Sequence, residues 1–225
     1  MPQKIDFDRY KTVIFDCDGV LLNSNQIKAQ AFFDVAKVYG ISPAEKLRDY
    51  HINNAGVSRI QKFEYLFEEI LKKSIDKKEL RSLLDQFSVN VKRELLTCEL
   101  DQSLESLRRV TSNIPWAIVS GGDQSELREV FAQRGIDSFF DRGIFGNPAS
   151  KHEIIKKENL STKKDCDLLF FGDSKYDFEV SREFQMDFIF VSQWTNLPNW
   201  QKYIKDYGID YINCLGDLLI DEDFP

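Results

Sequence analysis

The chain has 225 residues, with 30 Lys and Arg against 37 Asp and Glu, so its formal net charge is −7. Apolar residues make up 42% and charged residues 30%, which is typical of a globular chain with a full hydrophobic core and excludes a disordered one. The acidic balance excludes a general nucleic-acid-binding surface, because a phosphate backbone requires a basic face. A small phosphorylated ligand stays compatible with it, since a few local cations can bind such a ligand.

The sequence also bears on the compartment. Its apolar runs are only a few residues long, far short of the roughly 20 that a membrane-spanning helix needs, so we expect no membrane partner. The first ten residues carry charges where a signal peptide would need an apolar run. The cysteines show neither zinc-site spacing nor a disulfide framework. They are Cys17, Cys98, Cys166 and Cys214. We therefore expect a cytoplasmic protein that is a monomer or a homodimer.

The first predicted element is a strand, Thr12–Phe15, a short apolar run that ends at Asp16. From about residue 23 to residue 95 apolar residues recur at helical spacing, which predicts about four helices. One of them is expected to start at Ser42, because Ser-Pro-Ala-Glu combines an N-cap serine, a first-turn proline and an N3 glutamate. A helical block after the first strand predicts a small cap domain over residues 23–95, inserted into a core domain of residues 1–22 and 96–225.

The remainder of the chain alternates between strand and helix signals. Further short apolar runs predict strands at Trp116–Val119, Ile144–Phe145, Leu168–Phe171 and Phe188–Val191. Helix starts follow three of these runs. Asp123, Ser150 and Ser174 each precede an acidic residue by three positions, the spacing of an N-cap and its N3 acid. Alternating strands and helices predict an α/β fold with a doubly wound parallel sheet.

Acidic and polar residues follow the predicted strands. Ligands bind beyond the carboxyl ends of the strands in an open parallel sheet, and Asp16, Asp18, Ser120, Asp173 and Asp177 fall there. Several carboxylates in one crevice repel each other unless a hard divalent cation lies between them, and oxygen ligands with retained water are typical of Mg²⁺. One carboxylate can then act as a nucleophile that accepts a phosphoryl group.

Four motifs in this order resemble the haloacid dehalogenase superfamily of phosphohydrolases. They are DCDGV after the first strand, a second strand that ends in serine, the lone Lys151, and GDSKYD at residues 172–177. The motifs span Asp16 to Asp177, and the fold pattern covers most of the chain. The resemblance implies a Rossmann-like core with a helical cap, as in the subclass that contains phosphoglycolate phosphatase and β-phosphoglucomutase.

The resemblance also implies a role for each matching residue. Asp16 is the nucleophile, and Asp18 is the general acid that protonates the leaving alcohol and the base that then activates water. The groups that bind the transferred phosphate are Ser120, Gly121 and Lys151. The Mg²⁺ ligands are Asp16, Asp18 through its backbone carbonyl, Asp173 and Asp177. Asp177 either binds the metal or orients metal-bound water or Lys151.

The roles of several polar residues stay open. Arg59 and Lys62 follow the sequence AGVS and are either anion-binding residues or part of a solvated helix face. His51 and His152 lack metal-ligand spacing, so we assign neither a role.

The main hypothesis is a Mg²⁺-dependent phosphatase that hydrolyses a small phosphorylated metabolite, such as a sugar phosphate, through an aspartyl phosphate. The alternative is a phosphomutase of the β-phosphoglucomutase type, although those mutases tend to carry an acidic residue in place of Gly172. A dehalogenase does not need the acid at Asp18, and a phosphonatase needs a Schiff-base lysine in the cap, such as Lys28 or Lys37. A binding module without catalysis is the rival from another class.

Overall fold

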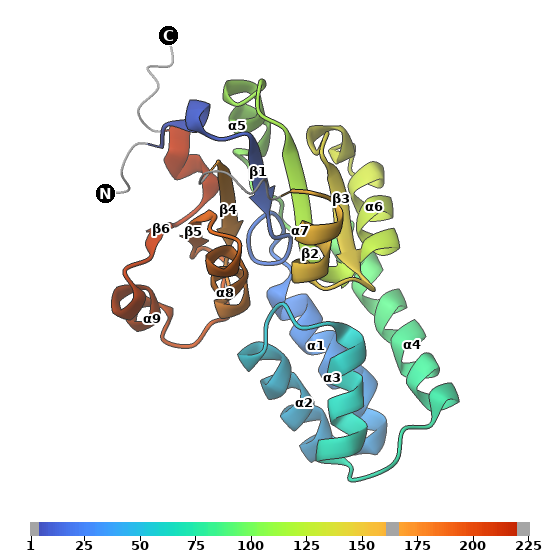
Figure 1. Ribbon diagram of the computed structural model, residues 1–225. Coiled ribbons are helices and arrows are strands. Elements are labelled where there is room, and N and C mark those ends of the chain that lie inside the picture. Colours follow the sequence, from blue (N-terminus) through green and yellow to red (C-terminus); the bar gives the residue numbers. More distant parts are fainter. Residues whose placement is uncertain (1–4, 161–166, 220–225) are drawn as a thin grey trace.

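The computed structural model describes residues 5–160 and 167–219. Six strands form one sheet in the order β3-β2-β1-β4-β5-β6, and every neighbouring pair is parallel (Figure 1). Their bounds are β1 Thr12–Phe15, β2 Trp116–Asp123, β3 Gly143–Asn147, β4 Leu168–Gly172, β5 Asp187–Val191 and β6 Asp210–Ile212. The predicted α/β fold with a parallel, doubly wound sheet is confirmed.

The register of the central strands brings their carboxyl ends to one edge of the sheet. Phe15 of β1 pairs with Ile118 of β2 and with Phe171 of β4. Every residue of β1 and β4 is buried, which explains why these strands read as continuous apolar runs. The residues that follow Phe15 and Phe171 therefore lie close together in space.

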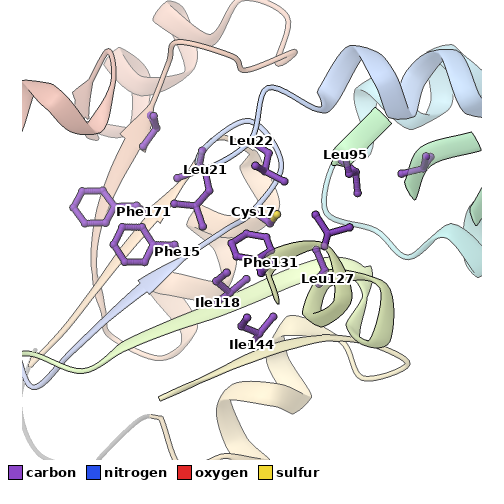
Figure 2. Close-up of a cluster of buried hydrophobic side chains, with 14 of the residues drawn as sticks. Phe15, Cys17, Leu21, Leu22, Leu95, Ile118, Leu127, Phe131, Ile144 and Phe171 are labelled. Atoms are coloured by element: carbon purple, nitrogen blue, oxygen red, sulfur yellow. The ribbon is translucent and has the colours of Figure 1, made fainter. Parts of the chain in front are cut away.

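Alternate side chains of the sheet pack against helices on its two faces. One face, which includes Phe15 and Phe171, packs against α5 (Leu104–Val110) and α6 (Gln124–Gln133). The opposite face, which includes Phe170, packs against α7 (Lys151–Lys157) and α8 (Lys175–Glu183). Helix α9 (Trp200–Tyr207) follows β5. Figure 2 shows the first cluster, in which Phe15 and Phe171 stack with ring centroids 5.3 Å apart.

Four helices follow β1, as the apolar spacing predicted. They are α1 (Asn25–Ala36), α2 (Ile41–Asn53), α3 (Arg59–Tyr65) and α4 (Lys77–Leu95), and a π-helical turn, Leu66–Ile70, extends α3. Figure 1 shows them beyond the end of the sheet toward which β1 points. Phe32 holds them together, with ring centroids 5.3 Å from Phe63 and 4.4 Å from Phe87. The division into domains at residues 22/23 and 95/96 stays a prediction; below, "the cap" denotes α1–α4 and the loops between them.

The predicted start of a helix at Ser42 is wrong. Helix α2 begins at Ile41, and Gly40 occupies the N-cap position with φ 108°. That conformation is open to glycine and strained for other residues, and it ends the preceding 3-10 turn, Lys37–Tyr39, immediately before α2. Ser42 therefore lies inside the first turn and caps nothing.

Two connections join the cap to the sheet, and they are hydrogen-bonded to each other. Leu22 and Leu100 form an antiparallel bridge, the Asn23 amide donates to the Glu99 carbonyl at 2.9 Å, and the Asp101 amide donates to the Leu21 carbonyl at 3.0 Å. The outgoing and returning segments thus form a short two-stranded ribbon.

Two further expectations concern thiols and membranes. Cys17, Cys98 and Cys214 are free, Cys17 is buried in the core, and Cys166 lies outside the described residues. Within residues 5–160 and 167–219, no helix combines the length and the apolar composition that crossing a membrane requires.

Candidate active site

Three carboxylates meet at the carboxyl edge of the sheet. Asp16 follows β1, Asp173 follows β4, and Asp177 lies in the first turn of α8, where it closes a capping box with Ser174. One oxygen of each carboxylate lies within 4.8 Å of the others, and all three side chains are buried. Three of the four carboxylates that the strand pattern predicted to converge therefore meet here, and Asp18 is the exception.

Lys151 is the buried cation of this cluster. The Ser150–Glu153 capping box starts α7 and places Lys151 in its first turn, fully buried. Its ammonium lies 2.7 Å from Asp16 Oδ1 and 2.5 Å from Asp177 Oδ1. Burial alone would lower the pKa of Lys151, but the two carboxylates raise it above its ordinary value. Lys151 is therefore a permanent cation at the centre of the site.

One lysine does not balance three buried carboxylates. Burial raises the pKa of Asp16 to about 7; the charge of Lys151 opposes this rise and the charge of Asp177 adds to it. Burial and the neighbouring carboxylates raise the pKa of Asp173 well above its ordinary value. Among the described residues, Asp16 Oδ1 also lacks a well-aligned hydrogen bond. A buried all-oxygen donor set with excess negative charge fits a hard divalent cation.

Asp18 points away from this cluster and toward the cap. Its carboxylate accepts a hydrogen bond from the Ser24 hydroxyl at 2.5 Å and forms an ion pair with Lys28 of α1. Burial would raise the pKa of Asp18, but Lys28 and the Ser24 hydroxyl lower it below its ordinary value. These contacts favour the ionised form of Asp18 in the absence of substrate, and its carboxylate lies outside the three-carboxylate group.

The carboxyl-terminal end of β2 faces the acidic cluster. Gly121 and Gly122 line the cavity, whereas Ser120 is fully buried and its hydroxyl accepts a hydrogen bond from the Gly122 amide at 3.0 Å. A side chain at Gly121 would place its Cβ 2.5 Å from the carbonyl oxygen of Gly56 in the cap. Glycine at position 121 is therefore required for the cap loop to approach this closely.

A cavity lies between the sheet and the cap. It contains about 560 Å³ of space between atoms, including its opening to solvent. Asp16, Asp18 and Asp173 line it from the core. Aromatic and cationic residues line it from the cap: Lys28, Phe32, His51, Arg59, Lys62 and Phe87.

Some of these contacts were not anticipated from the sequence. The Asn25 side-chain amide donates to Asp173 Oδ2 at 2.7 Å and to the Trp194 carbonyl at 2.9 Å. Lys28 was considered only as a Schiff-base candidate, and His51 was given no role. Asn25 and Lys28 are buried polar residues three positions apart on a helix whose other buried residues are mostly apolar, and that pattern is the signal that could have identified them.

Comparisons with known proteins agree with this geometry. The family model described as haloacid dehalogenase-like hydrolase matches residues 13–191. The phosphorylated carbohydrates phosphatase of Thermotoga maritima is 26% identical over 187 residues, which cover 76% of this chain and 80% of that protein.

Solved structures share the fold. A HAD hydrolase of family IA, variant 3, from Entamoeba histolytica has a TM-score of 0.72 at 17% identity, with 94% of this chain and 96% of that chain covered. The β-phosphoglucomutase of Clostridium difficile has a TM-score of 0.70 at 18% identity, with 93% of each chain covered. The four motifs, the parallel sheet and the family match together show that the chain belongs to the haloacid dehalogenase-like hydrolases.

Proposed function

We propose that the protein is a Mg²⁺-dependent phosphatase that hydrolyses a small phosphorylated carbohydrate or similar metabolite through an aspartyl phosphate at Asp16. The observation that carries this proposal is the position of Lys151, buried between Asp177 and Asp16, of which Asp16 lines the cavity below the cap. The similarity to a phosphorylated carbohydrates phosphatase supports the substrate class.

The residues at the carboxyl edge fit a divalent cation. Asp16 and Asp173 would hold Mg²⁺, together with the backbone carbonyl of Asp18 and, directly or through water, Asp177. When bound, the ion neutralises charge on the phosphoryl group during its transfer. Lys151 supplies a second positive charge beside Asp16, so part of this neutralisation is built into the chain itself.

The chemical steps use two carboxylates of the chain. Asp16 attacks phosphorus, the bond from phosphorus to the leaving oxygen breaks, and protonated Asp18 gives its proton to that oxygen. Water then attacks the aspartyl phosphate, ionised Asp18 takes its proton, and phosphate leaves. The contacts of Asp18 with Lys28 and Ser24 favour the ionised form, which the second step requires.

Local packing favours hydrolysis over the mutase alternative. A side chain at Gly172 would place its Cβ 2.5 Å from Cβ of Asp177, so an acidic residue at that position would displace Asp177. The phosphonatase candidates fit poorly as Schiff-base lysines, because Lys28 is paired with Asp18 and Lys37 is exposed on the cap surface.

The direct test is phosphate release from p-nitrophenyl phosphate by the purified protein with Mg²⁺. We expect Asp16→Asn to abolish release and Asp85→Asn, at an exposed position of α4, to leave it unchanged. Full activity of a folded Asp16→Asn variant would reject the nucleophile. Interconversion of sugar phosphates without phosphate release would identify a mutase instead. Cytoplasmic location and a monomeric or homodimeric state stay predictions.

A further inference from the structure

Lys62 is a buried cation of the cap for which the described segments of the chain provide no acidic partner. It lies on α3 with only 2% of its surface exposed. Among the residues that the structure describes, no carboxylate lies within ion-pair distance of its ammonium group. Buried lysines are normally paired, because removing an ammonium from water carries a large free-energy cost. Lys62 therefore requires an explanation other than packing.

The other cations of the same cavity do have acidic partners. Lys28 is paired with Asp18, and Arg59 lies 3.0 Å from Asp123 and 3.2 Å from Glu126. These pairs join the cap to the core. Lys62 differs because no carboxylate in the described part of the chain pairs with it, so its ammonium group is available to a ligand.

The immediate contacts of Lys62 orient it without neutralising it. Its ammonium lies 2.8 Å from Nδ1 of His51 and 5.6 Å from the ring centroid of Phe32. Burial and the charges of Lys62 and Lys28 lower the pKa of His51 well below its ordinary value, so the imidazole is neutral. Neutral His51 can accept a hydrogen bond from Lys62 at Nδ1 and donate one from Nε2. The Lys62 ammonium and His51 Nε2 can therefore both donate to one acceptor group.

Lys62 and His51 line the same cavity as Asp16, from the cap side. The core side of the cavity is acidic, so it would bind a phosphoryl group only with the help of Lys151 and a divalent cation. A molecule with its phosphoryl group at Asp16 that extended toward the cap would therefore place its other end near Lys62 and His51.

We propose that Lys62 and His51 bind a second anionic group of the substrate, a carboxylate or a second phosphate. The substrate class is thereby narrowed to phosphorylated metabolites that carry two anionic groups. This inference rests on the proposed phosphatase function and specifies its substrate.

The test compares phosphate release from matched substrate pairs. The carboxylate pairs are 6-phosphogluconate with glucose 6-phosphate and phosphoglycolate with ethyl phosphate; the phosphate pair is fructose 1,6-bisphosphate with fructose 6-phosphate. We expect the wild-type protein to prefer the doubly anionic member in kcat/KM. A preference in the carboxylate pairs would identify the second anionic group as a carboxylate, and a preference in the phosphate pair would identify it as a phosphate.

Variants of Lys62 test whether this residue causes the preference for doubly anionic substrates. We expect Lys62→Met to lower the ratio of the two kcat/KM values by about tenfold or more, mainly through KM, and Lys62→Arg to retain most of the ratio. Lys46→Met, on the exposed face of α2, should leave every ratio unchanged. No preference in any wild-type pair, or a preference that survives in folded Lys62→Met, would overturn the proposal.

Two further outcomes distinguish failure of the second-anion site from failure of the proposed phosphatase function. If the wild-type protein releases no phosphate even from p-nitrophenyl phosphate, the phosphatase proposal itself fails. If it hydrolyses that compound but prefers no doubly anionic substrate, only the second-anion site fails. Borohydride-dependent attachment of phosphonoacetaldehyde to Lys62 would also reject the site, since it would make this lysine a covalent nucleophile.

Discussion

Lys151 is the residue on which the acidic cluster depends, because it lies between two buried carboxylates and is itself fully buried. Removing one member of a buried ion pair leaves charge uncompensated, which typically costs about 3–5 kcal/mol. We expect Lys151→Met to lower the free energy of unfolding by about this amount in EDTA and to abolish phosphate release. Urea denaturation measures the first effect. Lys157→Met, exposed on the same helix, is the control, and equal stability of both variants would contradict the expectation.

Lys62 should give the stability of the protein a characteristic pH dependence. Burial and the charge of Lys28 lower the pKa of Lys62 to about 7, and Asp18 opposes this fall. An unfolded lysine titrates near 10.4, so between pH 7 and pH 10 the unfolded chain binds more protons and stability rises with pH. Lys62→Met removes this dependence. Its gain in stability is therefore largest below pH 7, on the order of 4 kcal/mol, and shrinks toward pH 10.

Urea denaturation of both proteins between pH 6 and pH 10 checks this expectation. His51, which faces Lys62, is already neutral over that range because its pKa is lowered well below the ordinary value. A gain in stability that does not vary with pH would contradict the interpretation of Lys62 as a buried charge.

Among the elements, the loop between α2 and α3 packs directly on the carboxyl-terminal end of β2. The Gly56 carbonyl leaves no room for a Cβ at Gly121, and Arg59 joins this part of the cap to Asp123 and Glu126. We expect Gly121→Ala to displace the cap loop and to lower kcat/KM by about a hundredfold, because small misplacements of reacting groups have effects of this size. Global stability should change little.

The matched control for this variant is Gly122→Ala. A Cβ at Gly122 would have its nearest neighbours at 3.3 and 3.4 Å, and all are side-chain atoms that can move. Steady-state kinetics and thermal unfolding of both variants provide the comparison. Equal kinetic effects of the two substitutions would show that the approach of Gly56 is not what matters.

The strands that carry the site could be predicted because they are buried on both faces. Burial makes β1 and β4 continuous apolar runs, and the capping signals at Ser150 and Ser174 are local in sequence. Strand β6 was not predicted, because Asp210–Ile212 is a short edge strand whose first two residues are exposed. The start of α2 was predicted wrongly, because the backbone at Gly40 rather than the Ser42 side chain sets it.

The residues on the core side of the site could be predicted from the sequence, whereas those on the cap side could not. Asp16, Asp173 and Lys151 follow strands or begin helices, so the topology of the sheet alone brings them together. Lys62 and His51 lie on separate helices whose orientation depends on the packing of Phe32 with its aromatic neighbours. Helical periodicity identifies the buried face of each helix but not the point in the cavity that a given residue reaches.

For the whole molecule, the acidic cluster links folding to metal binding. A ligand that binds only the folded state stabilises it by about 2.7 kcal/mol at a concentration of one hundred times its Kd. We expect Mg²⁺ to raise the unfolding midpoint and EDTA to reverse the rise.

The variant Asp173→Asn tests which residues produce this linkage. It should unfold at a higher temperature than the wild-type protein in EDTA, because it removes repulsion among buried carboxylates, and it should lose the response to Mg²⁺. Differential scanning fluorimetry measures both effects, with Asp85→Asn as the control. An unchanged response of Asp173→Asn to Mg²⁺ would place the ion elsewhere.

The paired segments around Leu22 and Leu100 restrict how the α-helical half of the molecule can move. Two separate tethers would permit tilting and twisting in several directions. A ribbon cross-linked by the Asn23–Glu99 and Asp101–Leu21 hydrogen bonds bends readily about a single axis and resists torsion. We therefore expect any opening and closing of the cap to follow one arc, along which Lys28, Arg59 and Lys62 leave and return as a unit.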